Sequence, residues 1–279
     1  MHYINTEARQ RIASNILETD LHIIDFRTTK KLPKPVFSLI IPVYQENKIL
    51  ESTLKLFSEL LKNKYKFELI VSDGGSDDGT IKIAEKYADA VIVHNSERRQ
   101  TIAEGRNNGA TLAESDTLVF LNADTVPSSL EEFCEVITDF ALQNNIFAVY
   151  DAMACYVSGF PDEVILKDKI FYKLHNAYVK LLNVLGLGMG RGECQVIRKS
   201  IFEQSGKYNN KIVAGEDFDL YKRVAKIGKI KFEKKLHVYE SPRRFRKYGY
   251  IRTISYWLLN SLSVMIFKKS YSKEWEAVR

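Results

Sequence analysis

Short apolar runs alternate with segments of helical periodicity through the first half of the chain. Runs of this length, rich in β-branched residues, are typical of parallel strands that are buried on both faces. They predict strands at residues 37–44, 67–73, 90–95 and 117–124. Helical spacing predicts helices between them at residues 47–63, 80–88 and 106–115. The alternation predicts a doubly wound α/β sheet, in which ligands bind at the carboxyl ends of the strands.

The second half of the chain is less regular, and both ends differ in composition from the middle. We expect helices at 130–145, 163–185 and 216–228, strands at 147–157 and 230–241, and a strand followed by a helix at 194–202. A polar leader of helical character, residues 1–32, precedes Pro33 and Pro35. These features divide the chain into a leader (1–35), a central domain (36–240) and a basic, amphipathic helical segment (241–279).

Composition and charge narrow the class of protein. The 279 residues are 45% hydrophobic and 27% charged, which is typical of a globular domain. A net charge of +6 favours anionic partners such as nucleotides or phospholipid headgroups. The three cysteines form no C-x-x-C pair, so neither a zinc site nor a disulfide framework is expected. Unpaired thiols and the lack of a signal-peptide pattern indicate a cytoplasmic location.

Polar clusters follow two of the predicted strands. In the stretch SDGGSDDGT, Asp73 could accept hydrogen bonds from a nucleoside, while the alternative is a turn in which Asp77 or Asp78 caps a helix. In the stretch NADT, Asp124 could bind a divalent cation that bridges to a diphosphate. Its alternative is again a helix cap, for which Thr125, Ser128 and Ser129 compete.

Two further clusters lie later in the chain. Glu216 and Asp217 open a predicted helix, where they either complement the helix dipole or supply a catalytic base. Arg243 and Arg244 follow the last predicted strand, where they either grip a phosphate or belong to a solvated or membrane-facing charged surface.

Taken in order, the stretches IPVYQEN, IVSDGGSDDGT, GRNNGA, VFLNADT and AGEDFDLYKR resemble glycosyltransferase family 2, over roughly residues 36–240. The resemblance implies the GT-A fold, an α/β architecture with a mostly parallel central sheet flanked by helices. One half would be Rossmann-like and bind the nucleotide, and the other would bind the acceptor. It further implies an inverting enzyme that moves a sugar from a UDP- or GDP-sugar to an acceptor hydroxyl.

The resemblance also assigns binding roles by position. The acid of the second motif holds the base or ribose, which places Asp73, and the basic segment before the fourth strand nominates Arg106 and Asn107 for the diphosphate. Arg98 and Arg99 are further candidates for that contact. The first motif lines the nucleotide pocket through Pro42, Val43, Tyr44 and Glu46.

The metal motif of the family, Asp-x-Asp, is Asn122-Ala123-Asp124 in this chain. The first acid is missing, so the resemblance assigns Mg²⁺ or Mn²⁺ to Asp124, with the donor diphosphate completing the coordination. Asn122 and Ala123 would then lie beside the donor. His237, at the end of the last predicted strand, is a candidate extra ligand, and its alternative is a structural role.

The Glu-Asp motif implies the catalytic base, for which Asp217 is the candidate, with Glu216 orienting it or contacting the acceptor. Arg243 and Arg244 would stabilise the departing diphosphate, although SPRRF is only a loose analogue of the Gln-x-x-Arg-Trp motif of some relatives. The acceptor would be a carbohydrate or a lipid-linked molecule, read by residues 156–195, and no nucleic acid is expected.

Residues 249–267 combine apolar positions with flanking basic residues. This pattern is typical of an interfacial helix, so residues 243–269 could contact the cytoplasmic face of a membrane. The alternatives are a helix packed on the sheet or in a homodimer interface.

Two other functions remain open. A nucleotidyltransferase would carry a glycine-rich basic loop after the first strand, where this chain has PVYQENK. A non-catalytic nucleotide-sugar-binding protein would explain Asn122 but not the intact GEDFD.

Overall fold

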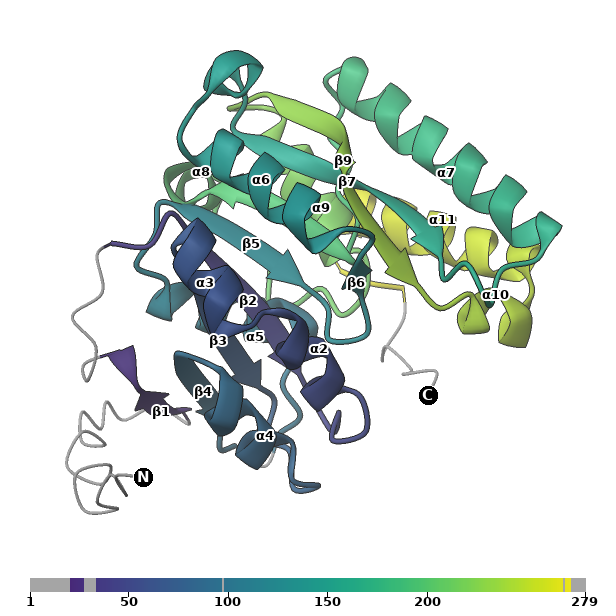
Figure 1. Cartoon of the computed structure of the whole chain (residues 1–279). Coiled ribbons are helices and arrows are strands. Elements are labelled where there is room, and N and C mark those ends of the chain that lie inside the picture. The colour runs from purple at the N-terminus through teal and green to yellow at the C-terminus, as the bar shows by residue number, and fades with distance from the viewer. Residues whose placement is uncertain (1–20, 28–33, 97, 268, 272–279) are drawn as a thin grey trace, which may run out of the picture.

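The computed structural model describes residues 21–27, 34–96, 98–267 and 269–271, and it contains one nine-stranded sheet (Figure 1). The strand order is β1-β4-β3-β2-β5-β8-β7-β9-β6. The strands are β1 (Leu21–Asp25), β2 (Phe37–Val43), β3 (Phe67–Asp73), β4 (Ala90–His94), β5 (Thr117–Leu121), β6 (Val126–Pro127), β7 (Ala152–Gly159), β8 (Cys194–Arg198) and β9 (Ile230–Glu240). Strands β4, β3, β2 and β5 are parallel neighbours, as the alternation in the sequence predicts.

The second half of the sheet reverses direction twice. Strand β8 is antiparallel to both β5 and β7, and β9 is parallel to β7. Strands β7 and β9 therefore run in the same direction as β5. The carboxyl ends of β2, β3, β5, β7 and β9 share one edge of the sheet, called the carboxyl edge below. Every strand end that carries a candidate polar cluster meets at that edge.

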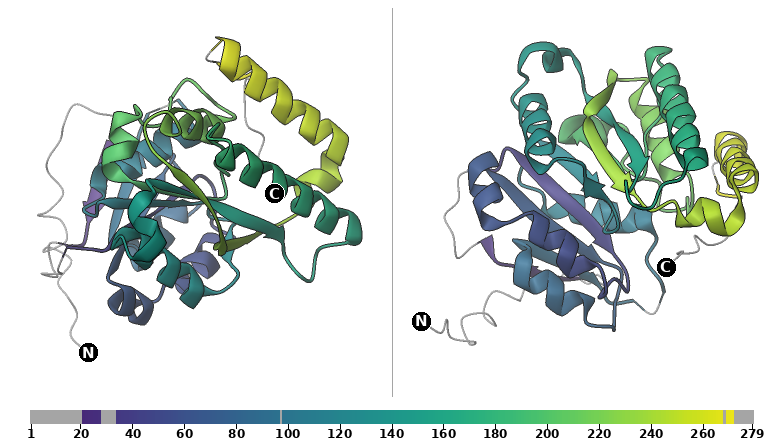
Figure 2. Two further views of the ribbon diagram at one scale, coloured as in Figure 1. Left: turned by 90° about the horizontal axis from the view of Figure 1, so that it is seen from above. Right: turned by 45° about the vertical axis from the view of Figure 1, so that its right-hand side comes forward.

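Helices cover both faces of the sheet (Figures 1 and 2). They are α2 (Leu50–Leu56), α3 (Glu59–Tyr65), α4 (Thr80–Tyr87), α5 (Ile102–Leu112), α6 (Leu130–Ala141), α7 (Leu166–Val184), α8 (Lys199–Gln204), α9 (Glu216–Val224), α10 (Arg243–Tyr248) and α11 (Tyr250–Phe267), with a 3₁₀ turn at Asn145–Val149. The predicted α/β fold with a mostly parallel central sheet is confirmed.

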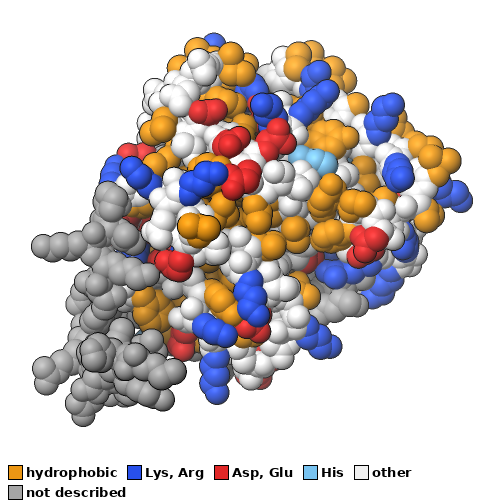
Figure 3. Space-filling view, in the orientation of Figure 1, with side chains coloured by type: hydrophobic (Ala, Val, Ile, Leu, Met, Phe, Trp, Pro, Cys, Tyr) orange, Lys and Arg blue, Asp and Glu red, His pale blue; other side chains and the backbone are white. Residues whose placement is uncertain are grey.

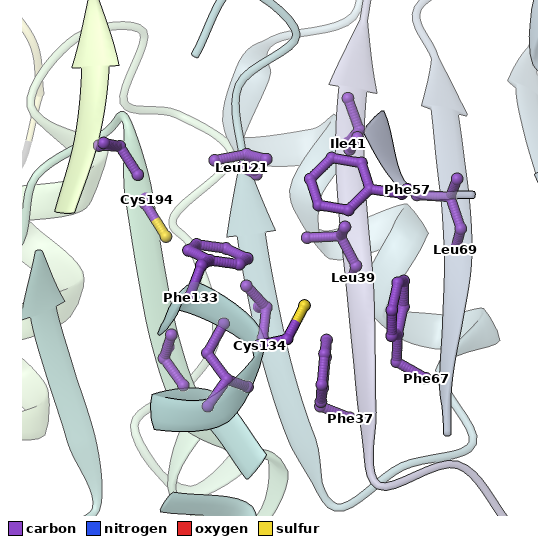
Figure 4. Packing of buried hydrophobic residues seen from close by; sticks show 14 of the residues in the cluster. Phe37, Leu39, Ile41, Phe57, Phe67, Leu69, Leu121, Phe133, Cys134 and Cys194 are labelled. Atoms are coloured by element: carbon purple, nitrogen blue, oxygen red, sulfur yellow. The ribbon is translucent and has the colours of Figure 1, made fainter. Parts of the chain in front are cut away.

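Successive side chains of the central strands point to opposite faces, so the sheet has two cores. In β2, Phe37, Leu39 and Ile41 lie in one core while Ile40 lies in the other. Phe133 and Cys134 of α6 pack in the first core beside side chains of β2, β3, β5 and β8 (Figure 4). Burial on both faces explains the continuous apolar runs in the sequence.

Two predicted elements differ from the structure. The helix expected over 47–63 is two helices, because α2 ends at Leu56 and Ser58 caps α3 by accepting a hydrogen bond from Leu61 N at 3.3 Å. The helical character expected for the leader is wrong at Leu21–Asp25, which forms an edge strand antiparallel to β4. Residues 1–20 lie outside the described part, and the domain boundaries at 35/36 and 240/241 remain predictions.

The described part of the C-terminal segment forms α10 and α11, and α11 packs on α7 through aromatic rings. Trp257 of α11 lies with its ring centroid 5.2 Å from that of His175 and 6.2 Å from that of Phe171. Arg246 and Tyr250 both hydrogen-bond the buried carboxylate of Asp168 on α7. Within the described residues, no helix has the length and apolarity that crossing a membrane requires.

Candidate active site

The loops that follow β2 and β3 are joined into one unit at the carboxyl edge. Backbone N–H groups of Gln45 and Glu46 donate to the hydroxyls of Ser76 (2.8 Å) and Thr80 (2.9 Å). Pro42 and Val43 pair in register with Ser72 and Asp73 across the two strands. The residues predicted for the nucleotide pocket, from Pro42 to Glu46, therefore lie beside Asp73 at the edge where a ligand would bind.

Asp73 is fully buried, and one of its carboxylate oxygens holds the turn that follows. Its Oδ1 accepts hydrogen bonds from the N–H groups of Gly75 (2.8 Å) and Ser76 (2.7 Å). Its Oδ2 has no partner within the described residues, and burial raises the pKa of this carboxyl group. Thr80 N donates to Asp78 Oδ1 at 3.1 Å, but the N-cap of α4 is Gly79, so the predicted alternative of Asp77 or Asp78 as the cap is wrong.

Aromatic and basic side chains meet beside this turn. The guanidinium of Arg99 lies 4.9 Å from the ring centroid of Tyr44, within reach of a cation–π interaction. A β-carbon on Gly74 would lie 3.3 Å from Cδ2 of Tyr44, so only glycine leaves this ring its full space. Arg98 instead forms two hydrogen bonds of 2.9 Å with the carboxylate of Glu104.

Arg106 and Asn107, predicted to lie along the diphosphate, have other partners. Arg106 is only 1% exposed; it donates to Glu216 Oε1 (2.7 Å) and Asn122 Oδ1 (3.1 Å). Asn107 donates to the carbonyl of Tyr208 at 2.9 Å and accepts from its N–H at 3.0 Å, which holds the loop before α9. The prediction is corrected: helix α5 turns Arg106 into the interior.

The Asn122-Ala123-Asp124 stretch crosses from the interior to the surface. Asn122 is held by Arg106, and its N–H donates to the carbonyl of Glu193 at 3.1 Å. Ala123 is buried, and its carbonyl accepts from Thr53 at 2.7 Å. Asp124 turns outward and accepts from Arg243 Nη2 at 2.8 Å.

The Asp124 carboxylate does not cap α6, because Ser129 does so by accepting from Glu132 N at 3.3 Å. The capping alternative for Asp124 is therefore wrong. The side chain of Asp124 is 42% exposed. Surrounding protein nevertheless raises its pKa by desolvation, and the positive charges of Arg243 and Arg244 act against this rise.

His237 does not join Asp124. Its Nε2 lies 2.6 Å from the hydroxyl of Ser158, and its ring packs edge-on against Tyr156 and Tyr239 at centroid distances of 5.0 Å. The described residues contain no group of three or more His, Cys, Asp and Glu side chains arranged for a metal ion. The prediction of His237 as a ligand is corrected, since these contacts give it the structural role.

Helix α9 brings Glu216 and Asp217 to the same place as Asn122. Gly215, with φ +86°, caps the helix in a left-handed conformation that favours glycine. Arg106 neutralises Glu216, whereas Asp217 Oδ2 would lie 3.5 Å from a β-carbon placed on Gly192. Burial, and next the charge of Glu216, raise the pKa of Asp217 to about 7. The pKa of Asp217 thus lies close to neutral pH, as a general base requires.

A second buried charge network lies beside these residues, and it was not among the predicted site residues. Arg191, 2% exposed, donates to Glu193 (3.0 Å) and Glu240 (3.2 Å), and its Nη1 lies 3.1 Å from His175 Nδ1. Burial and the charge of Glu193 raise the pKa of Glu240 well above its usual range. The charged residues inside the glycine-rich stretch LGLGMGRGE were the available signal.

The sheet order and the acids gathered at its carboxyl edge define the class of this protein as a GT-A fold. A family model described as glycosyl transferase family 2 matches residues 38–206. Because the match covers more than half of the chain, this chain belongs to that family.

Individual relatives are more distant. Validoxylamine A glucosyltransferase of Streptomyces hygroscopicus subsp. limoneus is 33% identical over 91 residues, which are 32% of this chain and 20% of that protein. Glycosyltransferase AglE of Haloferax volcanii is 25% identical over 203 residues, 70% of this chain and 62% of that protein. The chain thus spans less than two thirds of either relative.

Among solved structures, mannosyltransferase PcManGT from Pyrobaculum calidifontis, in complex with GDP-Man and Mn²⁺, is similar with a TM-score of 0.55 and 16% identity. The similarity covers 76% of this chain and 59% of that one. At this identity the likeness concerns the fold.

Proposed function

We propose that this chain transfers a sugar from a UDP- or GDP-sugar to an acceptor hydroxyl with inversion at the anomeric carbon. The observation that carries the proposal is the placement of Asp217. Its Oδ2 faces Gly192, its pKa is raised to about 7, and its neighbour Glu216 is already paired with Arg106. A carboxylate in this state can accept the proton that the acceptor hydroxyl loses during the reaction. Glu216, bonded to Arg106, holds the start of α9 and so orients Asp217.

The donor pocket is proposed at the joined loops after β2 and β3. The unpartnered Oδ2 of Asp73 supplies a hydrogen-bond acceptor for a base or ribose. Tyr44 and Arg99 add an aromatic ring and a positive charge to the pocket. The mannosyltransferase of similar fold was solved with GDP-Man and Mn²⁺, which supports a nucleotide-sugar donor.

A divalent cation fits this site only with help from the donor. Asp124 offers a carboxylate, which suits Mg²⁺ or Mn²⁺, but Asn122 is taken by Arg106 and His237 by Ser158. We therefore propose that Asp124 holds the ion together with the donor diphosphate. A bound ion would supply neutralisation of charge on the leaving diphosphate.

The remaining chemistry falls to the side chains of this chain. Asp217 takes the proton of the acceptor hydroxyl, and that oxygen forms a bond to the anomeric carbon on the side opposite the diphosphate. The bond from this carbon to the diphosphate oxygen breaks, and the electron pair leaves with the nucleoside diphosphate. Arg243, fixed at 2.8 Å from Asp124, and the adjacent Arg244 provide positive charge beside the departing group.

The acceptor is proposed to be a carbohydrate or a lipid-linked molecule that enters beside residues 156–195, where Gly192 adjoins Asp217. We extend the proposal to a peripheral contact of residues 243–269 with the cytoplasmic face of a membrane, where a lipid-linked acceptor would be presented. The positive charge of residues 241–273, which contain no Asp or Glu, supports this contact over a homodimer.

A thermal-shift screen of UDP- and GDP-sugars, with Mn²⁺ and with EDTA, tests donor and metal together. A ligand that binds only the folded state raises the unfolding temperature. We expect one nucleotide family to raise it with Mn²⁺, and we expect Asp124→Asn to reduce the shift. Asp116→Asn, at an exposed acid away from the site, is the control. If donors raised the unfolding temperature equally in EDTA, the metal role of Asp124 would be contradicted. If no donor raised it, the proposed function would be contradicted.

A further inference from the structure

Helix α7 carries a stripe of apolar side chains that points to solvent. Its members recur at helical spacing, so they lie on one face, and neighbouring α11 adds to the same surface. Their exposures are high for large apolar side chains: Leu166 71%, Ile170 51%, Leu174 66%, Leu181 54%, and on α11 Ile251 82% and Leu259 45%.

The opposite side of α7 already packs on the protein. Tyr172, Asn176 and Val179 are buried there, and Asn176 bonds the backbone of Val157 in β7. The exposed stripe is therefore additional to the apolar surface that holds the helix in place. Contiguous exposed apolar surface of this kind marks an interaction site in a folded protein.

The exposed charges within α7 have one sign, whereas Asp162 and Glu163 are exposed just before the helix. Lys167, Lys169, Lys173 and Lys180 are exposed on α7, whereas its one acid, Asp168, is buried and bonded to Arg246. The sequence from residue 241 to residue 273 contains eight basic residues and no Asp or Glu. In Figure 3, Lys and Arg side chains alternate with hydrophobic ones along α7, with no acidic side chain over that helix.

Helices α7 and α11 lie on the side of the molecule away from β1 and β4. In the left view of Figure 2 they are close at one end and diverge toward the other. Their contact runs through Trp257, which packs on Phe171 and His175. We call the exposed side of these two helices the docking face.

We propose that the docking face binds the surface of an anionic membrane. Apolar side chains would enter the boundary between headgroups and acyl chains, while the surrounding lysines would contact lipid phosphates. A second copy of this chain fits less well, because a symmetric contact would place the same cationic surfaces against each other. Binding would be peripheral, since no described helix is suited to span a bilayer.

The segments on either side of α11 contact residues of the active site or the loop before α9. Arg243 of α10 pairs with Asp124, and the hydroxyl of Ser270 accepts hydrogen bonds from Val213 (2.8 Å) and Ala214 (3.0 Å) just before α9. A bilayer on this face would therefore lie on elements that contact Asp124 and the loop before α9. This inference rests on the proposed function only in naming the acceptor class as a lipid-linked hydroxyl compound.

Vesicle co-sedimentation of the full chain tests the docking face. We expect binding to phosphatidylcholine vesicles that contain phosphatidylglycerol, and much weaker binding to pure phosphatidylcholine. Raising the salt concentration should release the protein, because salt screens the lysine contacts. Lys169→Gln and Lys173→Gln should each lower the partition coefficient by about fivefold, whereas Lys82→Gln, at an exposed lysine of α4, should not.

The apolar stripe is tested by Ile170→Glu with Leu174→Glu, and Leu60→Glu is the matched control, since Leu60 is 82% exposed on α3 outside the docking face. Loss of sedimentation in the double variant alone supports the proposal. Retained sedimentation, equal binding to neutral vesicles, or dimerisation abolished by the double variant would overturn it. The assay needs no nucleotide-sugar, so failure of the donor screen and failure of membrane binding are separate results.

Discussion

Arg106 is a buried positive charge on which two parts of the active site depend. It is 1% exposed and donates to Glu216 on α9, to Asn122 after β5 and to the carbonyl of Gly192 at 2.8 Å. Its single charge is neutralised by Glu216, so a neutral amide at position 122 can accept from its Nη2 without adding a second buried anion. This offers a physical reason for asparagine where the family motif has aspartate.

Replacing Arg106 should therefore destabilise the fold. Arg106→Gln leaves Glu216 buried without its partner, and we expect a loss of about 3–5 kcal/mol in the free energy of unfolding. The double variant with Glu216→Gln should recover part of that loss, because no uncompensated charge remains. Urea unfolding measures both. A single variant within about 0.5 kcal/mol of wild type would contradict the role of Arg106, since such small changes are usual for surface substitutions.

The pH dependence of activity should report Asp217. Only the deprotonated carboxylate can accept a proton, so kcat/KM should rise with pH and level off above an apparent pKa of about 7. Glu216→Gln should move this apparent pKa down by about one unit or more, because it removes a negative neighbour and leaves Arg106 uncompensated. A pH–rate profile for each protein measures the shift, and an unchanged or higher apparent pKa in the variant would contradict the assignment.

At the residue scale, the sequence could nominate side chains but not their directions. Asp73, Asp124, Glu216 and Asp217 were predicted from the order of the motifs that contain them, because each acid alone also has a local explanation in a turn, a helix cap or a helix dipole. The burial of Arg106 could not be predicted, because its partner Glu216 is 110 residues away along the chain. The same holds for His237, whose Ser158 partner comes from another strand.

At the scale of elements, α7, α10 and α11 form a unit centred on Asp168. This side chain is fully buried; it accepts from the N–H of Ile165 at 2.9 Å and from Arg246 at 3.0 Å, and it also bonds the hydroxyl of Tyr250. One carboxylate thus caps α7 and attaches the C-terminal helices to it. Since Arg243 belongs to the same short helix as Arg246, this attachment also positions the charge beside Asp124.

Asp168→Ala should loosen the C-terminal helices from α7. Three donors would lose their acceptor, so we expect a loss of about 1–3 kcal/mol in stability. We also expect faster trypsin cleavage after Arg246, Lys247 or Arg252. Asp162→Ala, at an exposed acid just before α7, is the control. If the Asp168 variant were cleaved at the wild-type rate, the attachment would not depend on this carboxylate.

Element positions were predicted better than element boundaries. Periodicity predicted α7, α9 and α11 nearly at their observed limits, because each has a buried stripe. The break at Phe57 and Ser58 was missed, since the apolar spacing continues through both helices. Strand β1 was missed because its pairing with β4 joins segments about seventy residues apart, and five residues show little periodicity of their own.

At the scale of the whole molecule, the sheet explains how distant motifs form one site. The parallel half was predicted from strand–helix alternation. The two antiparallel pairings of β8 were not, yet they return β7 and β9 to the direction of β5. This arrangement brings the end of β9 and the loop before β8 to the carboxyl edge. Glu193 and Glu240 thereby reach the side of Asp124, where the charge of Glu193 contributes to its raised pKa.

The most direct test of the account is turnover by Asp217→Asn. Release of nucleoside diphosphate and formation of glycosylated acceptor would be measured with the donor found by thermal shift, beside wild type and the Asp116→Asn control. We predict unchanged donor binding with at least about a hundredfold loss of kcat, because a neutral amide cannot accept the proton. Turnover within a few-fold of wild type would contradict the claim that Asp217 is the catalytic base of this glycosyltransferase.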